Sequence, residues 1–347
     1  MIAPSQSRSY WPALDGLRGF AILLVVLAHA GVLLGAVGGQ VGVTLFFVLS
    51  GFLITTIVVT EKDASGTINL RRFYGRRARR LLPALMLFLV VSSLFFSAVI
   101  DDFPFWASSW PGLFYVSNYT QILGVEVYAN THLWSLSVEE HFYALWPLIL
   151  LVPKRLPSAA TLLKIALALV ALRFVVGWGY PTWAYYGTLT NSYALLLGCS
   201  ISVAKRDGTI VRTRRGVAGS GAVGLVLLGM WPTVGLEELS FTGVWIPVMA
   251  ALVSALMVIA LTEKGAFYFE MSWLRYLGRV SYGWYLWHAP FLFISQFNDT
   301  PIKRVGFALM TLAVASVSWH LVERRMLIRR DGPTGLSNLE PQRSDVL

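Results

Sequence analysis

The sequence predicts an all-α, polytopic membrane protein with about ten transmembrane helices and both termini in the cytoplasm. Apolar side chains make up 56% of the 347 residues and charged ones only 13%. Soluble globular proteins, by comparison, have about a quarter of their residues charged. The apolar residues form runs of roughly 20, the length that crosses a bilayer as a helix. The cations lie mainly in every second connection between these runs.

Ten apolar runs are candidate membrane spans, and together they leave no room for a large soluble domain beside them. We therefore expect one transmembrane domain over residues 1–330, followed by a disordered cytoplasmic tail at 331–347 that is rich in Pro, Gly, Ser and charge. In chain order the runs cover residues 14–34, 41–60, 81–100, 136–152, 159–178, 190–204, 216–236, 241–262, 282–297 and 304–322.

The distribution of positive charge predicts the topology. Six arginines fall between residues 71 and 80, in the connection after the second run, whereas the connection between the first two runs holds no cation. Because cytoplasmic connections carry the excess of Lys and Arg, both termini are predicted inside. The net charge of +10 is then a topological signal, and we expect no nucleic acid partner. A single cysteine, Cys199, excludes a disulfide framework and a thiolate zinc cluster, and no metal site is expected.

The first run allows two interpretations. Arg8, the apolar stretch 20–27 and the triplet Ala28-His29-Ala30 are typical of a cleavable secretory signal. Asp15 and Arg18 inside the hydrophobic stretch favour a retained transmembrane helix instead, because signal peptides do not normally carry an ion pair there.

Ionisable residues inside membrane spans are candidates for a functional site, because burying them is unfavourable. Arg18 and His29 are eleven residues apart, which places them on one helix face about 16 Å apart along the axis. Arg18 is then expected near the cytoplasmic end and His29 in the outer half. The alternatives are a snorkelling Arg18 paired with Asp15 and a His29 that only bridges two helices.

Glu139 and His288 are the next two candidates. The fourth run crosses opposite to the first, so Glu139 and His29 are predicted to reach similar depths and to meet. A carboxylate that orients an imidazole is the arrangement that a general base requires. Glu139 and Glu140 could instead stabilise a helix N-terminus, and His288 could be a hydrogen-bonded core histidine.

Two further segments have alternative interpretations. Arg77 and Arg80 share a helix face in the basic segment, and guanidinium groups bind phosphates bidentately; binding of anionic lipid headgroups is the alternative. The outer connection 101–135 is rich in aromatic residues, which form either an interfacial belt or a surface on which sugar rings stack. Its aromatics include Phe103, Trp106, Trp110, Phe114, Tyr115, Tyr119 and Tyr128.

Five motifs occur in an order that resembles the membrane-bound acyltransferase family 3, which includes the O-antigen acetylases and other O-acylating enzymes of bacterial envelope sugars. The resemblance extends from Asp15 to Glu323. The motifs are Arg18 with His29, the glycine-containing stretch 43–52, the basic stretch 73–83, the stretch 132–139 and Tyr285-Leu-Trp-His288.

The resemblance implies transfer of an acyl group, usually acetyl, from cytoplasmic acyl-CoA to a hydroxyl of an extracytoplasmic carbohydrate or glycolipid, in a bacterial inner membrane. It ties activity to Arg18, His29, Arg77 and Arg80. Many members end the last span with Glu-Arg-Pro, whereas here Glu323 is followed by two arginines, so the resemblance assigns Glu323 no role. Many also carry an extracytoplasmic hydrolase-like domain, for which we find no room, so an extracytoplasmic partner protein is a candidate for handling the acceptor.

These inferences combine into one expected mechanism. Coenzyme A would place its phosphates on Arg77, Arg80 and Arg18, while its pantetheine arm enters the bundle towards His29, the general base, held by Glu139. An acyl-histidine relay is a variant, and a proton-coupled transporter that uses the same ionisable residues is the alternative function. Candidates for oxyanion or substrate contacts are Ser50, Tyr282, Tyr285, His288 and Trp134.

Overall fold

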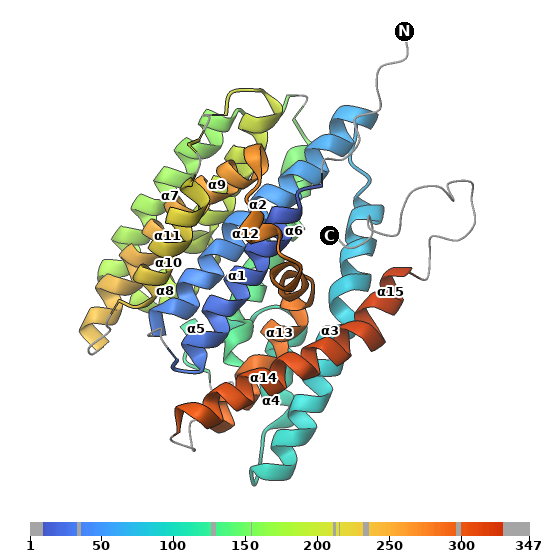
Figure 1. Cartoon of the computed structure of the whole chain (residues 1–347), viewed down its shortest axis with the longest axis vertical. Helices are drawn as coiled ribbons and strands as arrows, with labels where there is room; N and C mark the ends of the chain where they lie inside the picture. Colours follow the sequence, from blue (N-terminus) through green and yellow to red (C-terminus); the bar gives the residue numbers. More distant parts are fainter. Residues whose placement is uncertain are drawn as a thin grey trace.

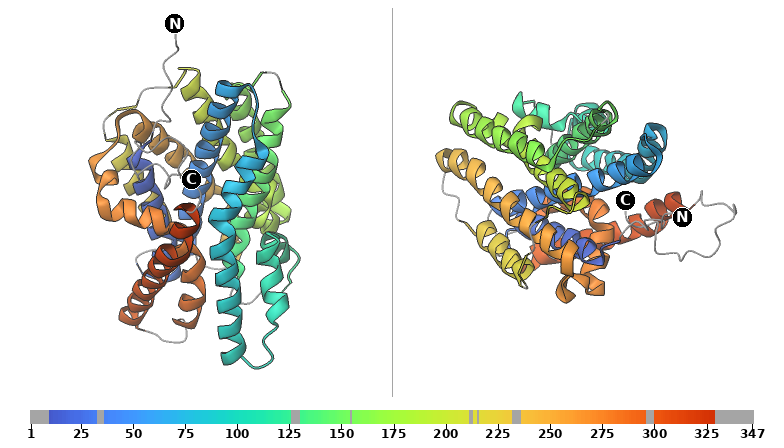
Figure 2. Two further views of the ribbon diagram at one scale, coloured as in Figure 1. Left: turned by 90° about the vertical axis from the view of Figure 1, so that its right-hand side faces the viewer. Right: turned by 90° about the horizontal axis from the view of Figure 1, so that it is seen from above.

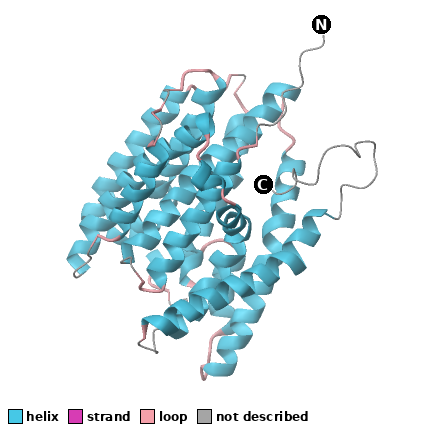
Figure 3. Cartoon of the chain, viewed as in Figure 1, coloured by secondary structure: helices cyan, strands magenta, loops and turns pink. Residues whose placement is uncertain are grey.

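The computed structural model describes residues 10–32, 36–125, 130–153, 155–210, 213–214, 216–231, 236–295 and 300–328. Every regular element within these ranges is a helix, as Figure 3 shows, and the all-α prediction is confirmed. Tyr128 and the tail 331–347, which we expected to be disordered, lie outside the described residues.

A helix occupies each of the ten predicted runs (Figure 1). Six of the helices in the described part of the chain are long and apolar enough to cross a membrane. The multi-pass character is therefore supported, while the count of ten and the cytoplasmic termini stay predictions. The ten helices are α1 (Pro12–His29), α2 (Ala36–Ser65), α3 (Leu70–Val99), α6 (Trp134–Leu151), α7 (Ala159–Gly179), α9 (Thr188–Arg206), α10 (Val217–Gly229), α11 (Leu236–Lys264), α13 (Ser272–Ser295) and α14 (Pro301–Ser318).

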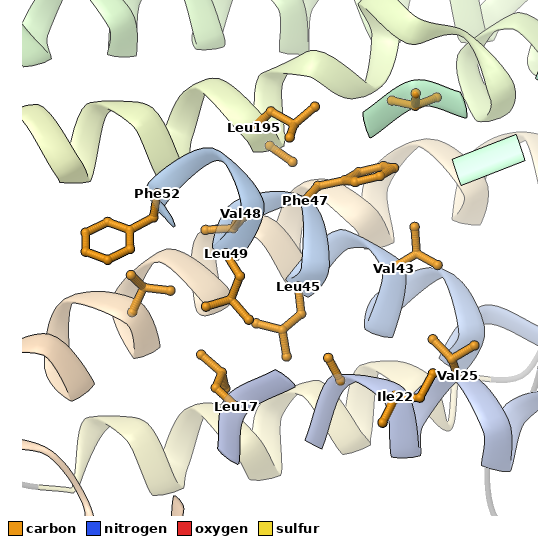
Figure 4. Packing of buried hydrophobic residues seen from close by; sticks show 14 of the residues in the cluster. Leu17, Ile22, Val25, Val43, Leu45, Phe47, Val48, Leu49, Phe52 and Leu195 are labelled. Atoms are coloured by element: carbon orange, nitrogen blue, oxygen red, sulfur yellow. The ribbon is translucent and has the colours of Figure 1, made fainter. Parts of the chain in front are cut away.

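The centre of the bundle is α1, which packs between α2 and α13, and α2 packs on its other side against α9. Figure 4 shows Leu17 of α1 opposite Leu45 and Leu49 of α2, and Val25 of α1 opposite Val43. Glycines allow these close contacts: a Cβ on Gly278 of α13 would lie 1.9 Å from the Asp15 carbonyl oxygen. Small residues at such crossings are typical of membrane helix pairs, since van der Waals packing drives their association.

The outward faces of the peripheral helices are apolar. On α3 the exposed side chains include Leu94, Phe95 and Val99, and on α7 they include Leu167 and Val175. Because these faces lack polar groups along most of their length, hydrocarbon is the solvent that suits them.

Basic residues gather at one end of the bundle. Arg206 at the end of α9 forms an ion pair with Asp63 near the end of α2, with Nε and Oδ2 2.6 Å apart. Lys205 lies over the ring of Trp11, which precedes α1. The alternating direction of successive helices brings these termini together, as the predicted topology requires for its cytoplasmic side.

The predicted outer connection 101–135 folds back into the bundle. It contains α4 (Phe105–Leu113), α5 (Ser117–Ile122) and the 3₁₀ turn Thr131–Leu133, and Figure 2 shows α4 returning beside α3. The Ser93 and Ser109 hydroxyls are 2.6 Å apart, and Gly112 lies against Leu89. At the tip Tyr115 has φ +55, a left-handed conformation that is costly for a bulky residue. The segment thus inserts between α3 and α6 instead of remaining wholly at the interface.

Three short helical pieces complete the described chain. They are α8 (Pro181–Tyr186), α12 (Phe267–Glu270) and α15 (Arg324–Ile328). A π-helical turn, Trp319–Glu323, joins α14 to α15.

Candidate active site

His29 is the last residue of α1, and its hydrogen bond defines its tautomer. Nδ1 lies 2.8 Å from the carbonyl oxygen of Val25. A carbonyl only accepts, so Nδ1 carries the proton and Nε2 keeps its lone pair. The residue is exposed. A neutral imidazole with an unprotonated Nε2 has the protonation state that a general base needs.

The protein holds the ring of His29 between two helices. The centroid of the His288 ring, on α13, is 4.9 Å away in an edge-on arrangement. On the other side, a Cβ added to Gly39 of α2 would lie 3.0 Å from Cε1 of His29. The sequence indicated His29 and His288 separately; their contact and the role of Gly39 come only from the packing.

The structure does not bring Glu139 to His29, which corrects the predicted pairing. Ser50 of α2 donates to Glu139 Oε1 at 2.8 Å, whereas His29 is level with Gly39 of the same helix. Eleven residues of α2 separate these two positions, which is about 16 Å along the helix. Glu139 instead lies within electrostatic range of Arg77 and Arg18. The prediction was wrong because it inferred the depth of each residue from its distance to the end of its own helix. The ends of α6 and α2 do not lie at equal depths, since α6 is much shorter than α2.

Two tyrosines predicted as oxyanion donors already use their single hydroxyl proton. Tyr282 donates to the Leu81 carbonyl at 3.0 Å, and Tyr285 donates to the His132 carbonyl. Trp134 packs against Phe47, with ring centroids 6.4 Å apart, and against Tyr185 and Tyr186 at 5.1 and 5.3 Å. In this arrangement neither phenol offers a hydrogen bond to a developing oxyanion.

Arg18 and Arg80, two of the arginines predicted to bind phosphate, line one pocket. The pocket also contains Arg279, a cation that we did not predict, and Asp15 is its carboxylate. Three guanidinium groups against one carboxylate leave an excess of positive charge. Arg18 is oriented by Ser281, whose hydroxyl accepts from Nη2 at 3.2 Å. The predicted topology places Arg279 on the cytoplasmic side. Only the packing of α13 against α1 brings it into the pocket of Arg18 and Arg80.

Arg77 lies apart from this basic pocket. It forms an ion pair with Glu140 and stacks its guanidinium over the Tyr143 ring at 3.5 Å. These residues line a second cavity, of about 210 Å³, together with Tyr115. Burial raises the pKa of the Tyr115 phenol, which therefore stays protonated. Because Glu140 already compensates the charge of Arg77, this residue is less suited to phosphate than Arg80 is.

Glu323 has a position that the sequence did not reveal. It is 1% exposed, accepts from Ser318 at 3.4 Å, and lies within electrostatic range of Arg80. The π-helical turn that presents it is a rare geometry, frequent at functional sites. The sequence lacks the Glu-Arg-Pro ending that would mark Glu323, although an acidic residue at the end of an apolar run is itself a signal of a functional site.

The route predicted for the pantetheine arm is filled along α1. Ile22, Val25 and Val26 lie between Arg18 and His29 and are 0%, 0% and 1% exposed. An arm that passes along this face needs these side chains to move. Among the described residues no group of three or more His, Cys, Asp and Glu side chains is placed to hold a metal ion.

Comparison with known proteins places this chain in a family. The sequence pattern of the acyltransferase domain family matches residues 11–323. The chain is 30% identical to the peptidoglycan O-acetyltransferase OatA of Listeria monocytogenes, over 94% of this chain and 57% of the relative. It is 29% identical to the O-acetyltransferase OatA of Staphylococcus aureus, over 97% of this chain and 60% of the relative. The chain thus spans a little over half the length of these relatives, and no solved structure matches it. The match over nearly the whole described bundle shows that the chain belongs to the acyltransferase family.

Proposed function

We propose that the protein is a membrane O-acetyltransferase that moves an acetyl group from acyl-CoA in the cytoplasm to a hydroxyl of an envelope carbohydrate. The observation that carries the proposal is the pair of sites on α1: a basic pocket around Arg18 and, eleven residues further, an imidazole with an available Nε2. The names of the relatives, peptidoglycan O-acetyltransferases among them, support a carbohydrate acceptor. A bacterial inner membrane is the location that fits this acceptor and the apolar helices.

The donor is assigned from the charge of the basic pocket. Coenzyme A carries several phosphate charges, and Arg18, Arg80 and Arg279 provide guanidinium groups that bind phosphate oxygens in pairs. On the predicted topology this pocket lies in the cytoplasmic half, where acyl-CoA is present. Arg77 contributes indirectly in this proposal, since it holds Glu140 and the helix α6 beside α3.

The reaction follows from the tautomer of His29. Nε2 takes the proton of the acceptor hydroxyl while its oxygen attacks the thioester carbonyl carbon, which forms the new C–O bond and an oxyanion. When the oxyanion collapses, the C–S bond breaks and the leaving sulfur receives the proton from His29. We do not assign Ser50 to the oxyanion, because its hydroxyl donates its proton to the carboxylate of Glu139.

The proposal requires movement of the bundle core. Because Ile22, Val25 and Val26 fill the face of α1 between the two sites, the thioester reaches His29 only when side chains there rearrange. The close helix contacts at Gly42, whose Cβ would lie 2.8 Å from Val25 Cγ2, mark where such an opening has to occur.

The test is transfer of labelled acetyl groups by membranes that contain His29→Ala. We expect a loss of about 10²- to 10⁴-fold in transfer, because this is the usual contribution of a general base. His320→Ala, at an exposed histidine, is the matched control and should transfer at the normal rate. Undiminished transfer by correctly inserted His29→Ala would end the proposal.

Two further measurements separate the alternatives. Release of free coenzyme A that depends on acceptor supports the enzyme, whereas unmodified substrate carried across the membrane without acetyl-CoA supports a proton-coupled transporter. Incubation with donor alone, followed by mass analysis of the peptide around His29, distinguishes direct transfer from an acyl-histidine relay.

A further inference from the structure

His288 has a buried nitrogen that is able to accept a hydrogen bond, but no donor lies within reach of it among the described residues. The residue is 0% exposed. Its Nδ1 lies 2.7 Å from the carbonyl oxygen of Tyr285, so this nitrogen carries the proton and Nε2 keeps a lone pair. Among the described residues Nε2 has no hydrogen-bond partner. A buried acceptor without a donor is unfavourable, which indicates that a donor arrives at some stage of the protein's work.

The nearest ring is that of His29, which has the same tautomer. Val25 takes the Nδ1 proton of His29 in the same way as Tyr285 takes that of His288. The two rings are edge-on with centroids 4.9 Å apart, a separation at which nitrogens on the ring edges can reach the roughly 2.7–3.2 Å of a hydrogen bond. In these tautomers neither Nε2 carries a proton, and no hydrogen bond joins the two rings among the described residues.

We propose that His288 is the positioning partner of His29 and accepts a hydrogen bond from Nε2–H of the His29 imidazolium. This inference rests on the proposed function. In the transfer step the O–H bond of the acceptor breaks and an N–H bond forms on His29. His288 gains and loses no proton; it stabilises the charged ring until His29 protonates the leaving sulfur. The Nδ1–H of the imidazolium donates to the Val25 carbonyl, and its single Nε2–H is shared between His288 Nε2 and the reacting oxygen or sulfur.

The surroundings fix His288 for this task. Its ring contacts those of His132 and Tyr285, each at a centroid distance of 5.4 Å. Tyr285 donates to the His132 carbonyl, which ties the 3₁₀ turn before α6 to α13. Glu139, the partner expected from the sequence, is committed to Ser50. His288 thus takes the orienting position that Glu139 was predicted to occupy.

The test compares His288→Gln with His288→Phe. Gln keeps an oxygen that accepts a hydrogen bond, whereas Phe keeps the ring and its packing but has no acceptor. We expect His288→Phe to lower kcat for acetyl transfer about 10- to 100-fold, the effect of a hydrogen bond to a charged group. His288→Gln should recover part of the rate. KM for acetyl-CoA should stay unchanged in both, because the basic pocket does not include His288.

The same pair of changes at His320, which is exposed, is the control, and rates are normalised to the folded protein measured by gel filtration. If His288→Phe transfers as fast as the unchanged protein, or faster than His288→Gln, the ring acts by packing and the inference is overturned. Should His29→Ala be inactive at the same time, the proposed function stands. Normal acetyl transfer by His29→Ala would instead refute both the proposed function and the inference about His288.

Discussion

The substitution Gly39→Ala tests whether the position of the His29 ring limits catalysis. A Cβ at this position would lie 3.0 Å from Cε1 and 3.4 Å from Nδ1 of His29. Carbon atoms in ordinary contact are about 3.5–4.0 Å apart, so the imidazole has to move by roughly 0.5 Å. Since a misplacement of about 1 Å can cost 10²-fold in rate, we expect acetyl transfer to fall about tenfold.

The same substitution should not weaken the fold. Alanine stabilises a helix interior by about 1 kcal/mol relative to glycine, so the thermal midpoint in detergent should be unchanged or higher. Gly306→Ala in α14 is the matched control, because no atom lies within 4 Å of its added Cβ. It should show the same helix effect with normal transfer. Transfer by Gly39→Ala at the rate of Gly306→Ala would refute the reasoning.

Three further perturbations have clear expected results. Arg80→Gln should raise KM for acetyl-CoA about tenfold or more, with Arg80→Lys in between, and salt should raise KM of the unchanged protein; an unaltered KM would contradict the phosphate site. Arg173→Met should lower stability by about 3 kcal/mol or more, because its fully buried guanidinium donates to carbonyls of Ala184, Thr190 and Gly243; a thermal midpoint within a degree of the original would argue against it. Gly278→Ala should prevent insertion of a stable bundle, since its Cβ would meet the Asp15 carbonyl at 1.9 Å; normal yield of monodisperse protein would disprove this contact.

The predicted site residues divide into those that the structure brings together and those that it separates. Arg18 and Arg80 share a pocket, and His29 meets His288. Glu139 lies deeper than expected, on Ser50, and Arg77 is paired with Glu140. Spacing along one helix predicts which residues share a face, because 3.6 residues per turn is a constant. It does not predict which residue of another helix is opposite.

The folded-back segment around Tyr115 shows the same limit. Its aromatic composition allowed either an interfacial belt or a sugar-stacking surface, and Trp106 and Phe114 are 71% and 66% exposed. Tyr115 nevertheless reaches the cavity beside Arg77. Composition does not encode where a connection turns inward, because that depends on the space left between α3 and α6.

The amino-acid sequence alone determined the helical class, the approximate position of each apolar helix and the likeness to an acyltransferase family. These properties follow from local hydrophobicity, helix periodicity and short motifs, which act within one segment. The tertiary structure decided that Arg279 joins Arg18 and Arg80, that His288 replaces Glu139 beside His29, and that the core between the two sites is closed. Such contacts join residues far apart in the sequence; Arg18 and Ser281, for example, are 263 positions apart. They depend on how closely glycines allow the helices to approach, which no single segment specifies.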